Sequence, residues 1–234
     1  MISIDGVSKT YGKARAVENV GFTAEPGAVT GLIGPNGSGK STTLRILLGI
    51  TRPDTGTATV GGSRYRDLAF PLRTVGALLD NAAPLPERRA VDHLTWIARS
   101  NGIPKVRARE VLDAVGLSRA AKDRVKSYSL GMRQRLGIAA ALLGDPDIIV
   151  LDEPMNGLDP EGIRWIRDLM RERADAGGTV LVSSHFMKEL ESVADHAVLL
   201  AGGRVRASGA LGDIVAGYPS LEEAYFDLTR EAAR

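Results

Sequence analysis

The feature that most constrains the fold of this chain is the segment at residues 34–41, which reads Gly-Pro-Asn-Gly-Ser-Gly-Lys-Ser. This is a G-x-x-x-x-G-K-S phosphate-binding loop, and it lies between a short apolar run and a helix-like stretch that begins near Lys40. Its glycines remove Cβ atoms, so that consecutive backbone N–H groups can curl around a phosphate. We expect Lys40 to reach the β- and γ-phosphate oxygens and the Ser41 hydroxyl to bind Mg²⁺. The sequence therefore predicts a nucleoside triphosphate site.

Two carboxylates follow a second apolar run. Residues 148–151 are Ile-Ile-Val-Leu, as expected for a buried parallel strand, and Asp152 and Glu153 come directly after them. The carboxyl ends of parallel strands face the ligand crevice of such a sheet. We expect Asp152 to hold Mg²⁺ through water and Glu153 to polarise the water that attacks the γ-phosphate. The alternative is a pair of solvated acids that cap a turn before Pro154.

A third motif precedes that strand. Residues 128–135 read Tyr-Ser-Leu-Gly-Met-Arg-Gln-Arg and lead into a run with helical periodicity. Further along, residues 157–160 read Gly-Leu-Asp-Pro, and His185 follows another strand-like run. In order and spacing these motifs resemble the ATP-binding cassette (ABC) ATPase family over nearly the whole chain. The resemblance implies an enzyme that hydrolyses ATP, with ATP and Mg²⁺ as its ligands.

The resemblance also implies roles for individual residues. Tyr11 would stack on adenine, although a half-buried tyrosine at a strand end is the alternative. Ser129 and Gly131 would bind the γ-phosphate held by a second subunit. Asp159 would lie in the loop that joins the two active sites, and His185 would contact the γ-phosphate and the catalytic water. The phosphate loop would comprise Gly34, Pro35, Asn36, Gly37, Ser38, Gly39, Lys40, Ser41 and Thr42.

The chain departs from the family pattern at two places. Its signature is Tyr-Ser-Leu-Gly-Met, where the usual form is Leu-Ser-Gly-Gly-Gln. After the strand-like run at 74–79 it has Asp80, where the family generally places a glutamine that touches Mg²⁺ and the water. Since an aspartate can ligate Mg²⁺ directly, we expect a metal site formed by Ser41, Asp80 and Asp152.

The pattern of apolar residues predicts the fold. Strand-like runs alternate with helical ones, which indicates an α/β fold: a P-loop NTPase core with a mainly parallel sheet. Alternating apolar residues near the N-terminus suggest an additional antiparallel β layer. We expect one nucleotide-binding domain over residues 1–234, with a core at 1–80 and 129–218, an inserted helical subdomain at 81–128 and a C-terminal helix at 219–234. Helical periodicity appears at 91–99, 106–115, 160–174 and 186–193, and strand-like runs at 179–183, 197–200 and 204–207.

Composition limits the classes of protein that remain. No uncharged apolar run approaches the ~18 to 20 residues that cross a bilayer, and the N-terminus does not resemble a secretory signal. The absence of cysteine excludes disulfides and thiolate metal sites. We therefore expect a soluble, cytoplasmic protein whose membrane pore belongs to another chain.

Positive charge is concentrated in one segment. Residues 99–135 hold ten Lys or Arg against three acids, a balance of +7 in a chain whose net charge is +2. The resemblance implies that this segment contacts the membrane partner. Its positive charge could there bind acidic segments of that partner, which couple the two proteins, or an anionic membrane leaflet. A solvated helical face is the alternative. No aromatic platform or recognised nucleic-acid fold accompanies the charge, so no nucleic-acid partner is expected.

The leading hypothesis is the ATPase subunit of an exporter, resembling those of drug or antibiotic efflux systems. It would work as a head-to-tail dimer, with an identical or a different second subunit, and drive separate transmembrane permease subunits from the inner face of the cell membrane. The alternative is a soluble, non-transport ABC ATPase of an assembly complex. A regulator without turnover conflicts with Glu153 and His185, and a GTPase is disfavoured because no N-K-x-D segment occurs.

Overall fold

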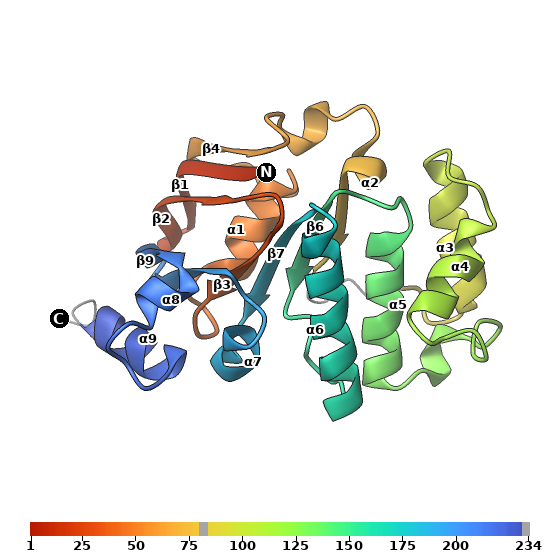
Figure 1. Ribbon diagram of the computed structural model, residues 1–234. Coiled ribbons are helices and arrows are strands. Elements are labelled where there is room, and N and C mark those ends of the chain that lie inside the picture. Colours follow the sequence, from red (N-terminus) through yellow and green to blue (C-terminus); the bar gives the residue numbers. More distant parts are fainter. Residues whose placement is uncertain (80–83, 231–234) are drawn as a thin grey trace.

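The fold combines two β-sheets with helices on both faces of the larger one (Figure 1). It is described from a computed structural model, which covers residues 1–79 and 84–230. The smaller sheet is antiparallel and has the strand order β2-β1-β4. Its strands are β1 (Ile2–Tyr11), β2 (Ala14–Ala24) and β4 (Thr55–Val60). The antiparallel layer that the N-terminal alternation predicts is therefore confirmed.

The larger sheet has the strand order β5-β6-β7-β3-β8-β9 and is parallel except for its last pair, β8 with β9. Every residue of β3, β6 and β7 is buried, as expected for strands covered on both faces. This confirms the predicted α/β class with a mainly parallel sheet. The strands are β3 (Ala28–Ile33), β5 (Val75–Leu78), β6 (Ile148–Asp152), β7 (Thr179–Ser184), β8 (His196–Ala201) and β9 (Arg204–Ala210).

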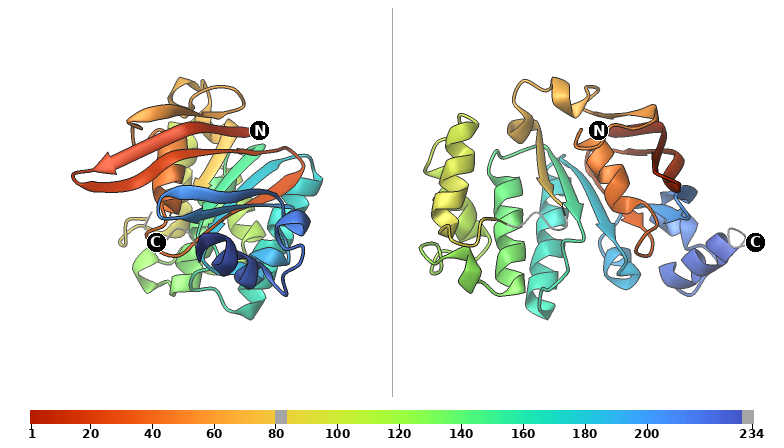
Figure 2. Two further views of the ribbon diagram at one scale, coloured as in Figure 1. Left: turned by 90° about the vertical axis from the view of Figure 1, so that its left-hand side faces the viewer. Right: turned by 180° about the vertical axis from the view of Figure 1, so that it is seen from behind.

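The helices surround this sheet (Figure 2). Helix α1 packs against strands of both sheets, α5 and α6 pack on the opposite face of the larger sheet, and α3 and α4 pack on α5. The helices are α1 (Lys40–Leu47), α2 (Pro71–Thr74), α3 (Ala90–Ser100), α4 (Arg107–Ala114), α5 (Leu130–Leu142), α6 (Pro160–Asp175), α7 (Met187–Glu191), α8 (Leu211–Ile214) and α9 (Leu221–Arg230), with 3₁₀ turns at Tyr65–Asp67 and Val125–Ser127. Among the described residues, no helix has the length and apolar character needed to cross a membrane.

The central strands divide their side chains between two hydrophobic cores. In β6, Ile149 and Leu151 join the core beneath α5 and α6, whereas Ile148 and Val150 join the core around α1. The same alternation in β7 sends Val180 and Val182 to one core and Leu181 to the other. The larger sheet thus forms a shared wall between the two cores.

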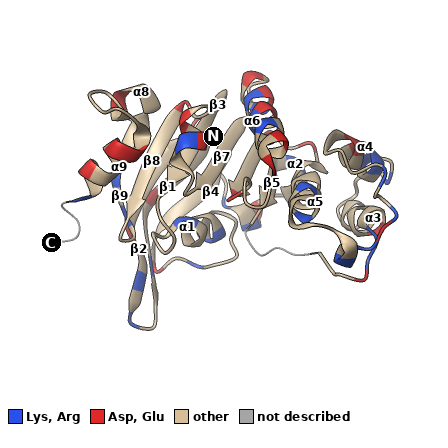
Figure 3. Cartoon of the chain, turned by 90° about the horizontal axis from the view of Figure 1, so that it is seen from below, with Lys and Arg blue, Asp and Glu red and all other residues tan. Residues whose placement is uncertain are grey.

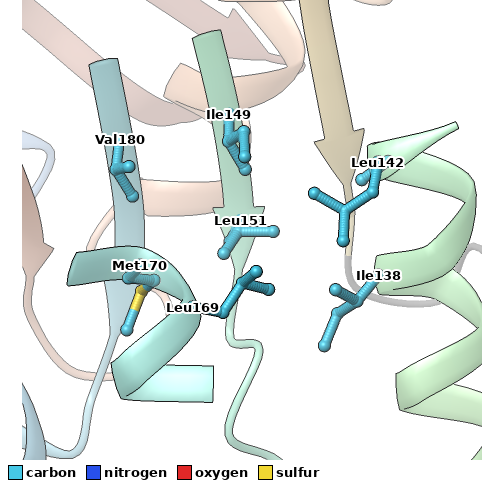
Figure 4. Close-up of a pocket in the computed structure, with 8 residues that line it drawn as sticks. Ile138, Leu142, Ile149, Leu151, Leu169, Met170 and Val180 are labelled. Carbon is cyan, nitrogen blue, oxygen red and sulfur yellow. The ribbon is translucent and has the colours of Figure 1, made fainter. Parts of the chain in front are cut away.

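A small apolar cavity lies where α5 and α6 meet this wall (Figure 4). Its volume is about 10 Å³, which is at the lower limit for one water molecule. No polar side chain lines it, so we assign it to packing and not to ligand binding. The lining residues are Ile138, Ala141, Leu142, Ile149, Leu151, Leu169, Met170 and Val180.

Figure 3 shows where Lys and Arg lie along the chain, and several of those in the basic segment at 99–135 make contacts within the fold. Arg124 and Lys126 both pair with Glu87, at 2.8 and 3.1 Å. Two arginines of α5, Arg133 and Arg135, donate to backbone carbonyls. The ion pairs with Glu87 use part of the positive charge of the segment within the fold, and its contact with a membrane partner stays a prediction.

Candidate functional site

The phosphate loop connects β3 to α1, and close packing requires glycine at two of its positions. A Cβ atom on Gly34 would lie 2.3 Å from the carbonyl oxygen of Leu200. Gly39 has φ of +108°, and a Cβ there would lie 2.7 Å from the carbonyl oxygen of Ala16. Because Gly39 occupies the N-cap position, α1 begins without a side-chain cap. Its first N–H groups are thus available to an anion.

Lys40 is buried at the start of α1, although it carries a charge. Its Nζ donates to the carbonyl oxygens of Gly34, at 2.6 Å, and Pro35, at 3.3 Å. It also lies 3.2 Å from Oε1 of Glu153, and both side chains of this ion pair are almost fully buried. The ammonium is therefore held over the phosphate loop by two carbonyls and one carboxylate.

Glu153 joins Lys40 to His185. Its other carboxylate oxygen, Oε2, lies 2.8 Å from Nδ1 of His185 and accepts from the His185 backbone N–H at 3.3 Å. Since an ionised carboxylate only accepts hydrogen bonds, this contact makes Nδ1 the donor. The three residues follow β3, β6 and β7, which are neighbours in the sheet. The sheet order is therefore what brings them together.

Asp152 ends β6 inside the protein. Its Oδ1 accepts from the hydroxyl of Ser183 at 2.5 Å, and the same hydroxyl accepts from the backbone N–H of Glu153 at 3.2 Å. Ser183 is fully buried in β7. One serine thus fixes both residues of the acidic pair.

The predicted signature and joining-loop residues lie at the starts of two helices. Ser129 caps α5 by accepting from the N–H of Met132, at 3.2 Å, and it is exposed. A Cβ on Gly131 would lie 2.9 Å from the carbonyl oxygen of Gly157. Asp159 caps α6 by accepting from the N–H of Gly162, at 2.8 Å. The roles of Ser129, Gly131 and Asp159 toward a second subunit stay predictions.

Tyr11 lies at the tip of the β1–β2 hairpin and is half exposed. It pairs with Ala14 across the hairpin, and β2 then reaches Ala16, the residue that a Cβ on Gly39 would touch. The tyrosine therefore belongs to a hairpin that contacts the phosphate loop. Both the stacking role and the strand-end alternative stay open. Asp80, predicted to bind metal, lies outside the described residues.

The residues present fit a nucleotide. The hydroxyl of Ser38, in the phosphate loop, is buried and has no hydrogen-bond partner within the described part of the chain. A buried polar atom without a hydrogen-bond partner costs free energy. The Ser38 hydroxyl therefore indicates a polar ligand at this loop. The uncapped start of α1 and the Lys40 ammonium favour an anionic ligand at the same loop. Ser41 and Thr42 follow in the first turn of that helix.

Sequence reasoning missed two residues of the site. Gln134 on α5 donates from Nε2 to the carbonyl oxygen of Glu153, at 3.1 Å. Ser183 contacts Asp152 and Glu153, as described above. Ser183 lies near the end of the apolar run that precedes His185, but that position alone did not indicate its contacts. Nothing in the local pattern indicated the contact of Gln134.

Comparison with known proteins gives consistent matches. The family model described as ABC transporter matches residues 17–156. The ABC transporter ATP-binding protein YdbJ of Bacillus subtilis is 38% identical over 215 residues, covering 90% of this chain and 70% of the relative. The lantibiotic transport ATP-binding protein SrtF of Streptococcus pyogenes is 36% identical over 207 residues, covering 88% of this chain and 89% of the relative.

Solved structures are similar over most of the chain. The ATP-binding subunit of an ABC transporter has a TM-score of 0.88 at 30% identity, covering 98% of this chain and 99% of its own. The bacterial ABC transporter cassette MJ0796, solved as a dimer, has a TM-score of 0.80 at 26% identity, covering 90% of this chain and 99% of its own.

Proposed function

The chain belongs to the ABC transporter family, and from that premise we propose that it is the ATP-hydrolysing subunit of an exporter. As a member of the family it binds nucleotide and hydrolyses ATP. The observation that carries the proposed mechanism is the buried ion pair of Lys40 and Glu153, with the partly exposed His185 bonded to the same carboxylate. It places the Lys40 cation, at the start of α1, beside a carboxylate and an imidazole that follow the neighbouring strands β6 and β7.

In the proposed mechanism these residues divide the work of hydrolysis. Lys40 and the N–H groups of the phosphate loop hold the β- and γ-phosphates. Glu153 orients a water and accepts its proton as the oxygen attacks the γ-phosphorus. The bond from that phosphorus to the bridging oxygen breaks, which leaves ADP and inorganic phosphate. His185 keeps the carboxylate of Glu153 in place and faces the γ-phosphate. Mg²⁺, held by Ser41, Asp152 and Asp80, would neutralise phosphate charge when bound.

We propose that hydrolysis requires two subunits. Ser129 and Gly131 would meet the nucleotide bound by a second subunit, identical or different, and Asp159 would connect the two sites. The exposed hydroxyl of Ser129 at the N-terminus of a 13-residue helix supports this role, since it presents a donor and a favourable dipole. The dimeric state of the similar MJ0796 cassette supports it as well.

The transport role rests on the relatives. SrtF is named for lantibiotic transport, and by analogy we propose that this chain drives separate permease subunits from the cytoplasmic face of the membrane. The alternative, an ATPase of a soluble assembly complex, predicts different partners. No nucleic-acid partner is proposed.

Purification of the tagged protein from membranes of the native cell distinguishes the exporter role from the assembly role. An exporter subunit should copurify with a polytopic membrane protein after detergent extraction, and ATP hydrolysis by that complex should be lost in Lys40→Ala. Recovery only in a soluble complex, with hydrolysis intact there, would favour the assembly role. A complex in which Lys40→Ala hydrolyses ATP at the wild-type rate would contradict the proposed mechanism.

A further inference from the structure

Gln134 connects the signature helix to the group that activates water. It lies on α5, the helix that Ser129 caps, and its Nε2 donates to the carbonyl oxygen of Glu153 at 3.1 Å. We propose that Gln134 is a positioning residue for ATP hydrolysis, which acts by holding the backbone of Glu153. The proposal rests on the proposed function, in which Glu153 orients the attacking water.

The backbone of Glu153 needs such support. Its φ is +50°, in the left-handed region that a residue with a Cβ atom rarely adopts. Among the other described residues that are not glycine, only Asn19 and Asp145 have positive φ. Conformations of this kind persist only where the surroundings hold them. The direction of the Glu153 carboxylate therefore depends on the contacts that fix its two peptide groups.

These contacts hold both sides of the Glu153 Cα atom. On one side, its N–H donates to the carbonyl oxygen and to the hydroxyl of Ser183, at 3.1 and 3.2 Å. On the other side, its carbonyl oxygen accepts from Gln134 and from the N–H of Asn156, the latter at 3.2 Å. Ser183 belongs to the sheet and Asn156 to the same turn as Glu153. The start of α5 also packs against this turn at Gly157, and the bond from Gln134 is the contact by which α5 holds the carbonyl of Glu153 itself.

The consequence is a link between the two parts of the proposed hydrolysis site, one of which would come from each subunit. The helix that would present Ser129 to the nucleotide of a second subunit also holds the backbone of Glu153, whose carboxylate would act on the nucleotide of its own subunit. A shift of α5 would move the carbonyl of Glu153 and with it the carboxylate. Since reacting groups lose about a hundredfold in rate for a displacement of about 1 Å, a modest change at Gln134 should affect turnover.

Two substitutions separate positioning from packing. Gln134→Met keeps an unbranched side chain and helix propensity but removes the N–H donor. Gln134→Lys returns a donor on a long side chain. We expect Gln134→Met to lower kcat roughly tenfold or more with KM for ATP within roughly twofold. Gln134→Lys should recover a large part of that loss, which a purely steric role would not predict.

A double-mutant cycle with Glu153→Gln tests the route of the effect. If Gln134 acts through Glu153, adding Gln134→Met to Glu153→Gln should lower the residual rate by no more than roughly twofold. A full tenfold loss in that background, a wild-type kcat in Gln134→Met, or a raised KM with unchanged kcat would each overturn the proposal. Wild-type turnover in Glu153→Gln would overturn the proposed function itself, so the two failures can be told apart.

Discussion

Glu153→Gln is the substitution whose effects follow most directly from the structure. It removes the negative partner of Lys40 while it keeps the size of the side chain. The two charged groups lie 3.2 Å apart, with relative side-chain exposures of 5% and 8%. Removing one member of a buried pair costs about 3 to 5 kcal/mol, because the other charge is left without its counterion. Lys40 keeps its bonds to two carbonyls, so the lower value of about 3 kcal/mol applies.

This loss should be measurable as a shift in thermal unfolding. For a chain of this size about 1 kcal/mol corresponds to roughly 2 to 4 °C, so we expect nucleotide-free Glu153→Gln to unfold about 6 to 12 °C below wild type. With MgATP the difference should shrink, because phosphate oxygens supply Lys40 with a new negative partner. At the same time kcat should fall by about a hundredfold, or about 2.7 kcal/mol, the scale for loss of a general base. A nucleotide-bound dimer should accumulate.

The matched control is Glu110→Gln. Glu110 pairs with Arg107 at 3.1 Å, but this pair is much more open to solvent, with relative side-chain exposures of 50% for Glu110 and 28% for Arg107. The same substitution there should change stability by less than about 1 kcal/mol. Equal unfolding temperatures for nucleotide-free Glu153→Gln and wild type would refute the electrostatic reasoning. Unchanged turnover would refute the assignment of Glu153 as the residue that orients water.

Three further predictions concern other parts of the chain. Ser129→Arg should leave ATP affinity of the monomer nearly unchanged but abolish ATP-dependent dimerisation in gel filtration; dimers formed as in wild type would contradict a role across the subunit interface. Asp80→Ala should raise the free Mg²⁺ needed for half-maximal ATPase rate, and Asp80→Gln should retain most activity; identical metal dependence in Asp80→Ala would remove this residue from the metal site. Burial, with a smaller contribution from the charge of Arg88, lowers the pKa of His93 in the folded state. The unfolded chain therefore binds this proton more readily, so the free energy of unfolding should fall as the pH drops below about 6.5. Between pH 7 and pH 5 the free energy of unfolding, measured with denaturant, should fall less in His93→Gln than in wild type. An equal fall in the two proteins would contradict this prediction.

The sequence predicted those parts of the fold in which local pattern and burial agree. The helices expected at 91–99, 106–115 and 160–174 correspond to α3, α4 and α6 within a residue or so. The helix expected at 186–193 is shorter, because α7 covers only Met187–Glu191. The strand expected at 204–207 is longer, since β9 continues through Ala210 by pairing with β8 as far as His196. Pairing partners far along the chain decide such ends, and local periodicity does not report them.

Within the site, residue types were easier to predict than their mutual contacts. Lys40 and Glu153 could be singled out from the residues around each of them and His185 from the resemblance to the ABC family, and the sheet order then brought them together. The left-handed backbone of Glu153 ran against the usual preference for glycine at such a position. It is held by Ser183 and Gln134, whose contacts with it join three separate elements. A contact of that kind depends on the packed tertiary structure.

The larger sheet, which forms the wall shared by the two hydrophobic cores, also determines how the protein should unfold. Because β3, β6, β7 and β8 each send side chains into both cores, neither core can come apart without exposing the other. We expect amide protons of these strands to exchange with deuterium only through global unfolding, and therefore at one common, slowest rate. Amides at the tip of the β1–β2 hairpin should exchange through local fraying, many times faster. The strands β6 and β7, which Glu153 and His185 directly follow, thus belong to the last part of the protein to open.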